Sequence, residues 1–160
     1  MHSALREAWK DQVLAEDYEA HMAAIGQARA NAGHLREMLA RYPPPPGAMI
    51  WLAGAGPGQM FDYLAGELLS SWRLVCTDIS QRFLSVLRGR CPKAECVVED
   101  LLQPALAGEC DTAVVVLVLE HLDWRRGVES LAARRPKQVF VVIQQNPEGM
   151  QSAVSPQRVL

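Results

Sequence analysis

An apolar run that breaks into three alternate glycines constrains this chain more than any other feature. Ile50–Ala53 is apolar, Gly54, Gly56 and Gly58 follow, and apolar residues then resume with helical spacing. Glycine accepts positive φ, and without a Cβ it lets the backbone come close to a ligand. A helix after such a turn points its free N–H groups into the same space. We therefore predict a strand, a tight turn and a helix that form a nucleotide-binding corner.

Apolar strands and amphipathic helices alternate along the rest of the chain. The run Thr112–Leu119 is apolar almost throughout, as in a central parallel strand that is covered on both faces. Strands that alternate with helices of this length form parallel βαβ units. The sequence therefore predicts a doubly wound α/β fold. The expected strands are residues 48–53, 73–77, 95–98, 112–119 and 138–144, and the expected helices between them are 58–71, 81–90 and 121–135.

The N-terminal part has a different character. Residues 1–41 are rich in Ala, Glu, Arg, Leu and Met and contain no proline, which predicts two helices. Gly26 and Gly33 weaken the second of them, and a break is expected near Asn31–Gly33. Four consecutive prolines in residues 42–47 then end the helical region and favour a stiff linker. We therefore divide the chain into a helical extension or lid (1–41), a proline-rich linker (42–47) and a sheet domain (48–160).

Composition excludes several classes of function. The 160 residues carry a formal net charge of -2, with the basic residues spread along the chain, so no nucleic-acid surface is expected. The four cysteines lack C-x-x-C spacing, which favours reduced thiols and predicts no metal site. The N-terminus lacks the apolar core of a signal peptide, and no run is long enough to span a membrane. We expect a cytoplasmic protein of one domain with a small-molecule substrate.

Polar residues stand where the predicted strands end, which is where doubly wound sheets bind ligands. Asp78 follows the second strand and can accept both hydroxyls of a ribose that lies across the glycine turn, although an aspartate there can also cap the next helix. Glu120 and His121 follow the fourth strand and are the candidate proton acceptors for catalysis, His121 because imidazole titrates near neutrality. Packing of His121 over a bound nucleoside is the other interpretation.

The glycine spacing separates two families of nucleotide-binding proteins. A dinucleotide turn has G-x-G-x-x-G, but Gln59 stands where its third glycine belongs. The G-x-G-x-G form resembles motif I of the class I S-adenosylmethionine-dependent methyltransferases. Asp78, Asp100 and the stretch Asp111–Leu122 also match that family in order and spacing, so that the resemblance covers residues 50–146.

The resemblance implies a sheet with strand order 3-2-1-4-5, helices on both faces and S-adenosylmethionine as cofactor. It implies that Asp78 binds the ribose and that Asp100 accepts from the adenine amino group. Carried over position by position, it predicts a cofactor site of Gly54, Ala55, Gly56, Gly58, Asp78, Ile79, Asp100, Leu101 and Leu119.

Two features depart from the family pattern. Leu52 stands where the family commonly has an acidic residue that orders the methionine part of the cofactor. We therefore expect either weaker cofactor binding or a contact from another group, for instance one of the N-terminal helices. After the fifth strand the sequence is too short for the family's last strands, so we expect a truncated chain, a trimmed family member or a sheet edge completed by a partner chain. An uncovered edge strand favours pairing and predicts a homo-oligomer.

The sequence therefore favours an S-adenosylmethionine-dependent methyltransferase that acts on a small molecule. Two alternatives stay open. A nicotinamide-dependent oxidoreductase also uses a glycine turn and an acid after the second strand, and Gln59 counts against it. A non-catalytic binding protein with the same fold would explain Leu52 and the short C-terminal part.

Overall fold

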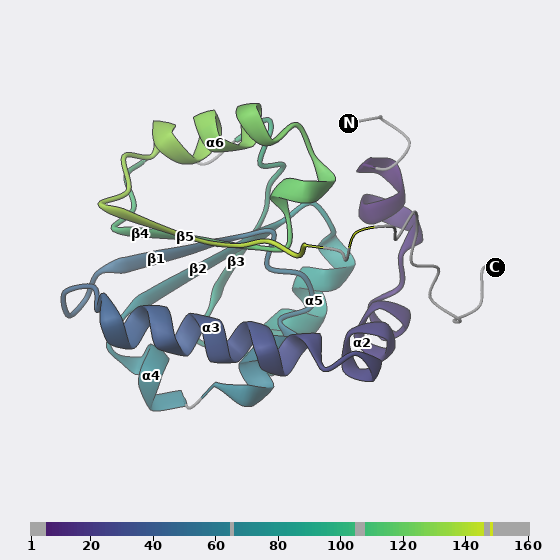
Figure 1. The fold of residues 1–160 in the computed structure, drawn as a ribbon, viewed down its shortest axis with the longest axis horizontal. Helices are drawn as coiled ribbons and strands as arrows, with labels where there is room; N and C mark the ends of the chain where they lie inside the picture. The colour runs from purple at the N-terminus through teal and green to yellow at the C-terminus, as the bar shows by residue number, and fades with distance from the viewer. Residues whose placement is uncertain (1–5, 65, 105–107, 146–147, 149–160) are drawn as a thin grey trace.

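Five parallel strands form the centre of the molecule, as a computed structural model of residues 6–64, 66–104, 108–145 and 148 shows (Figure 1). Their order across the sheet is β3-β2-β1-β4-β5, which confirms the predicted doubly wound topology. Register is set along the central strand, where Ile50 pairs with Leu74 on one side and Thr112 on the other. The strands are β1 (Met49–Ala53), β2 (Arg73–Asp78), β3 (Glu95–Val98), β4 (Thr112–Val116) and β5 (Gln138–Val142).

Most helices cover one face of the sheet, and in Figure 1 they lie below the strands. This core is fully apolar, and Leu39, Leu52, Leu84 and Leu87 are buried in it almost completely. Leu52 therefore packs under the sheet instead of facing a ligand. The covering elements are α3 (Gln27–Arg41), the 3₁₀ turn η2 (Gln59–Tyr63), α4 (Gly66–Ser70) and α5 (Gln81–Arg90).

The opposite face is covered by α6 (Trp124–Ala133) alone among the described helices. Trp51, Val115 and Leu131 form the centre of this second core. On the edge strand β5, Phe140 points into the first core, while Val139 and Val141 alternate with it and remain exposed. Among the described residues β5 pairs only with β4, so it is an edge strand, and whether another chain covers it stays a prediction.

Three helical segments precede the sheet where two were predicted. They are η1 (Ala8–Gln12, a π-helical turn), α2 (Ala15–Ala24) and α3. The break lies at Gly26, which has a left-handed backbone with φ of 67°, and the predicted weak point near Asn31–Gly33 is wrong. Asn31 and Ala32 are buried there, so packing against the sheet outweighs the poor helix propensity of Gly33.

Several other predicted boundaries also differ, among them the end of β5, which lies at Val142 and not at residue 144. The helix expected over 58–71 is divided into η2 and α4, because Leu64 has an extended backbone after the 3₁₀ turn. The fourth strand ends at Val116 and not at Leu119, because Leu117 takes a φ of +55°. Residues 119–121 then form the short 3₁₀ turn η3 (Leu119–His121), and α6 starts only after Asp123, whose carboxylate accepts from the N–H of Arg126 (3.4 Å).

Candidate functional site

A cavity of about 560 Å³ opens at the carboxyl ends of the strands, between them and the N-terminal segments η1 and α2. In Figure 1 these segments lie past the right-hand ends of the strands. The cavity brings together most of the predicted site residues: Gly54, Gly56, Asp78, Ile79, Asp100, Leu101, Glu120 and His121. Three others, Ala55, Gly58 and Leu119, lie outside its lining.

Each glycine of the turn has a left-handed backbone, with φ of 67°, 59° and 74° at Gly54, Gly56 and Gly58. A Cβ on Gly54 would lie 2.4 Å from Cγ2 of Val118, and one on Gly58 would lie 2.8 Å from Cγ of Leu87. These two glycines are therefore required by packing. Gly56 is different, because the nearest atom to its Cβ position is 3.8 Å away, on the ring of Tyr18, so its backbone is open to the cavity.

Asp78 joins the end of β2 to the glycine turn. One carboxylate oxygen accepts from the N–H of Gly56 and the other from the N–H of Ser80, both at 2.8 Å. Burial raises the pKa of Asp78, against the lowering effect of these backbone hydrogen bonds. The helix-cap alternative is not what the structure has, because Ser80 caps α5 by accepting from the N–H of Phe83 (3.3 Å). Each oxygen of Asp78 keeps a further lone pair for a ligand hydroxyl.

The end of β3 contributes two neighbouring carboxylates with different surroundings. Asp100 accepts from the N–H of Leu102 (2.9 Å) and forms an ion pair with Arg6, which precedes η1. Glu99 is buried and accepts twice from the guanidinium of Arg134, at 2.7 Å to each oxygen. The ion pair of Asp100 therefore connects the end of β3 to the N-terminal segment.

The end of β4 carries the candidate proton acceptors. Glu120 accepts from the backbone N–H of Gln144 (3.2 Å), so that it ties η3 to the end of β5. The ring of His121 packs against Trp9, with 5.6 Å between ring centroids, and its packing over a bound nucleoside stays a prediction. The left-handed Leu117 lies just before them, and its N–H donates to the carbonyl of Val142 (2.8 Å). Strain of this kind is often found at functional sites.

An aromatic group forms the wall of the cavity opposite the strand ends. The ring of Tyr18 lies 5.8 Å from Trp9 and 5.4 Å from Phe83, between centroids. Burial, and then the negative charges of Asp78 and Glu120, raise the pKa of Tyr18 to about 12, so its hydroxyl is neutral at physiological pH.

Residues 1–41 were predicted to form an extension or lid, and Tyr18 and His21 of this segment line the cavity. Arg6, Trp9 and Phe83 also line it and were not predicted as site residues.

The described residues contain no group of three or more His, Cys, Asp or Glu side chains that could bind a metal ion. Within the same part of the chain, every helix is too short or too polar to cross a membrane.

Comparison with protein families gives a match over more than half of the chain. Residues 52–138 match a family described as a methyltransferase domain. This range begins in β1, ends at the first residue of β5 and includes the glycine turn, Asp78 and Asp100. The comparison with curated proteins finds no matching sequence.

Several solved structures share the fold. Magnesium protoporphyrin IX methyltransferase from Synechocystis PCC 6803 with bound SAM has a TM-score of 0.65 at 16% identity, over 82% of this chain and 70% of that one. The plantazolicin methyltransferase BpumL with SAH has a TM-score of 0.64 at 17% identity, over 86% and 56%. The glycopeptide N-methyltransferase MtfA with SAM has a TM-score of 0.52 at 22% identity, over 68% and 48%.

These similarities show a shared fold. The chain spans about half the length of several of these proteins, for example 50% of a second structure of the protoporphyrin enzyme.

Proposed function

The chain belongs to the family of methyltransferase domains, and on this premise we propose that it binds S-adenosylmethionine and transfers the methyl group to a small-molecule acceptor. The observation that carries this proposal is the buried carboxylate of Asp78, hydrogen-bonded to the glycine turn at Gly56 and open to a cavity at the switch point of the sheet. The structures of similar fold that contain SAM or SAH support it.

The residues around the cavity fit such a cofactor. Asp78 has acceptor capacity left for two ribose hydroxyls, and the open backbone at Gly56 gives room for the chain that extends from the ribose. Ile79 and Leu101 supply apolar surface for the base. Asp100 lies beside them and can accept from the amino group of the base when its ion pair with Arg6 opens. The cofactor supplies an activated methyl group on a sulfonium centre, so the protein must chiefly orient an acceptor and exclude water.

A proton acceptor is needed only where the methylated atom loses a proton. Glu120 and His121 are our candidates, since both line the cavity at the end of β4. Glu120 is held by the N–H of Gln144 through one oxygen, which fixes the side chain and leaves the second oxygen for a substrate proton. His121 packs on Trp9, and we propose that it mainly shapes the site.

Residue 59 also bears on the oxidoreductase alternative. Gln59 takes the place of the third glycine of a dinucleotide turn, and its amide donates to the carbonyl of Glu19 in α2 (2.9 Å). A glycine could not make this contact. The residue that departs from the dinucleotide pattern thus has a structural use, which supports the methyltransferase proposal.

We also propose that three segments of the chain have different roles. Residues 1–41 supply a wall and lid for the cavity, residues 42–47 link them to the first strand, and residues 48–160 carry the cofactor site. The four cysteines are unpaired, which supports a reducing compartment such as the cytoplasm.

Calorimetric titration of S-adenosylhomocysteine into the purified chain tests the proposal. We expect saturable binding that NAD does not compete with and that Asp78→Asn, which keeps the shape of the side chain, weakens by at least about tenfold. Absence of binding to a folded chain would contradict the proposal and favour the non-catalytic alternative, while competition by NAD would favour the oxidoreductase.

A further inference from the structure

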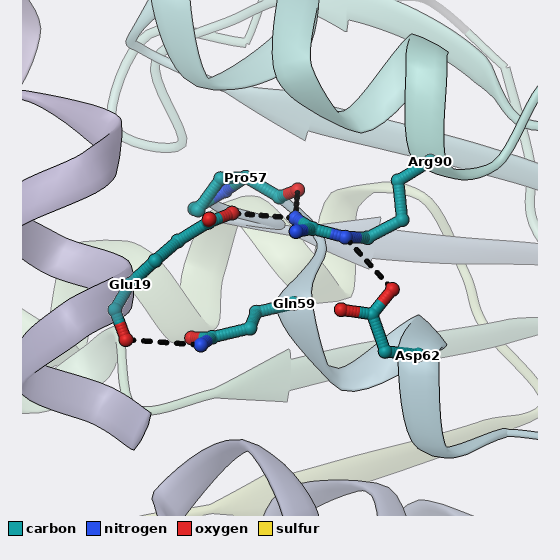
Figure 2. Close-up of polar contacts among 5 residues, drawn as sticks. All are labelled: Glu19, Pro57, Gln59, Asp62 and Arg90. Carbon is teal, nitrogen blue, oxygen red and sulfur yellow. Dashed lines mark hydrogen bonds and ion pairs between the residues drawn. The ribbon is translucent and has the colours of Figure 1, made fainter. Parts of the chain in front are cut away.

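Arg90, the last residue of α5, binds three separate parts of the molecule (Figure 2). Its Nη1 donates to a carboxylate oxygen of Glu19 (2.5 Å) and to the carbonyl of Pro57 (2.7 Å), and its Nε donates to Asp62 (2.9 Å). Glu19 lies on α2, Pro57 in the glycine turn and Asp62 in η2. The guanidinium fork therefore joins the N-terminal segment to the turn that faces the cavity.

A second contact reinforces this junction. Gln59, the first residue of η2, donates from its side-chain amide to the backbone carbonyl of Glu19 (2.9 Å), so that Glu19 is bound through its main chain as well as through its side chain. We call Glu19, Pro57, Gln59, Asp62 and Arg90 the clasp. The pKa of Arg90 is raised by its hydrogen bond to Glu19, as expected when a charged form is stabilised by its partner.

The clasp is adjacent to residues that line the cavity. Tyr18 immediately precedes Glu19, and its ring is the nearest group to the Cβ position of Gly56. His21 and Met22, one turn along the same helix, also line the cavity. A rotation of α2 that breaks the bond from Arg90 to Glu19 would therefore also change the position of Tyr18 over the glycine turn.

We propose that Arg90 is a positioning residue that, through the clasp, holds α2 against the glycine turn and so sets the wall of the cofactor cavity. Its Nη1 donates to both Glu19 and Pro57, which fixes the helix and the turn relative to each other, and the bond from Nε to Asp62 holds the plane of the guanidinium in place. The expected effect of Arg90 on cofactor binding rests on the function proposed above. Its expected effect on the position of α2 is independent of that function.

Hydrogen exchange of the ligand-free chain tests the clasp directly. We expect Arg90→Met to speed amide exchange within α2 by about tenfold, the size expected for losing a charge-assisted hydrogen bond, while β1 and β2 exchange as before. Glu19→Gln removes the charge only at the α2 end and leaves Arg90, Pro57 and Asp62 in place, so it should act in the same direction by a smaller factor. Arg90→Lys should restore part of the protection.

Arg73→Met is the matched control, because Arg73 forms an exposed ion pair with Glu95 (2.7 Å) across β2 and β3, outside the cavity lining. It should leave exchange in α2 unchanged. Unchanged amide exchange of α2 in both Arg90→Met and Glu19→Gln would overturn the proposal. Exchange that becomes faster in the central strands by the same factor as in α2 would also overturn it, because that would mean a general loss of stability.

Titration of the same variants with S-adenosylhomocysteine separates this proposal from the proposed function. If the original chain binds, Arg90→Met should weaken binding by about tenfold and Arg73→Met should not. If the variants loosen α2 and affinity stays constant, Arg90 does not position the cofactor site. If the original chain does not bind, the proposed function fails, while the exchange data still decide whether the clasp holds α2.

Discussion

Two arginine–glutamate pairs lie on either side of the cavity, and their surroundings differ. Arg90 and Glu19 are partly exposed, with 18% and 24% of their side-chain surface accessible, and they join a surface helix to the glycine turn. Arg134 and Glu99 are almost completely buried, at 6% and 0%, and they join the end of α6 to the residue after β3. A partly hydrated pair can open at small cost, whereas a buried pair cannot.

The buried pair is also part of a larger assembly. The guanidinium carbon of Arg134 lies 3.7 Å from the centroid of the Trp51 ring, and the indole N–H of Trp51 donates to Thr77 (2.9 Å), which precedes Asp78. The face covered by α6 alone is thus reinforced by a cation on an aromatic ring. We infer that the strand-end side of the cavity is a fixed support and that the α2 side is a movable wall.

The largest expected effect is a loss of folding stability when the buried ion pair of the fixed support is broken. Arg134→Met leaves the buried Glu99 carboxylate without its guanidinium partner, and removal of one member of a buried pair costs about 3–5 kcal/mol. Urea denaturation of the full chain measures this loss. Replacing both residues, Glu99→Leu with Arg134→Met, should recover much of it, and a loss below about 1 kcal/mol in the single variant would remove the distinction between the two pairs.

A second test concerns the glycine turn, which the fixed support carries. Gly54→Ala places a methyl group 2.4 Å from Cγ2 of Val118 at a φ of +67°, so strain and overpacking should cost about 2–4 kcal/mol. Gly33→Ala is the matched control, since nothing lies within 4 Å of its Cβ position in α3, and it should stabilise the chain by about 0.5–1 kcal/mol. Equal midpoints for the two variants in urea would contradict this account of the turn.

The sequence predicted the fixed support much better than the movable wall. The strand order was implied by the family resemblance, and the convergence of Gly54, Gly56, Asp78 and Asp100 follows because a parallel sheet brings all its strand ends to one edge. Leu117 was placed inside a strand, since its left-handed backbone has no signal in an apolar run.

The contacts of the wall join residues far apart in the sequence. Arg90 and Glu19 are separated by 71 positions, and each looks like an ordinary surface charge on its own helix. The same holds for Glu99 and Arg134, which only the packing of α6 brings together. Residue pairs of this kind depend on how helices are placed over the sheet, and a single sequence carries no periodic signal for that placement.

The pH dependence of cofactor binding sharpens the view of Asp78 as a fixed acceptor. Burial raises its pKa above the ordinary value of an aspartate, and only the ionised form accepts from two ribose hydroxyls. Affinity for S-adenosylhomocysteine should therefore be complete well above the raised pKa and fall as the pH decreases through it, by up to about tenfold per pH unit. Calorimetry across a pH series measures the onset. Asp78→Asn should bind weakly at every pH, and the same slope in that variant would assign the effect to another group.

The smallest expected effect concerns cofactor affinity and the ion pair between Arg6 and Asp100, at the N-terminal end of the movable wall. Arg6 pairs with Asp100, the carboxylate we assign to the adenine amino group, so the N-terminal segment and the ligand compete for one oxygen. Because the Arg6 side chain is 39% exposed, the pair contributes little, and Arg6→Met should raise affinity for S-adenosylhomocysteine by only about two- to fivefold. Inosine-containing analogues, which lack the amino group, should gain nothing from the change. A loss of affinity in Arg6→Met would mean that Arg6 contacts the ligand itself, and the N-terminal segment would then be a fixed part of the site.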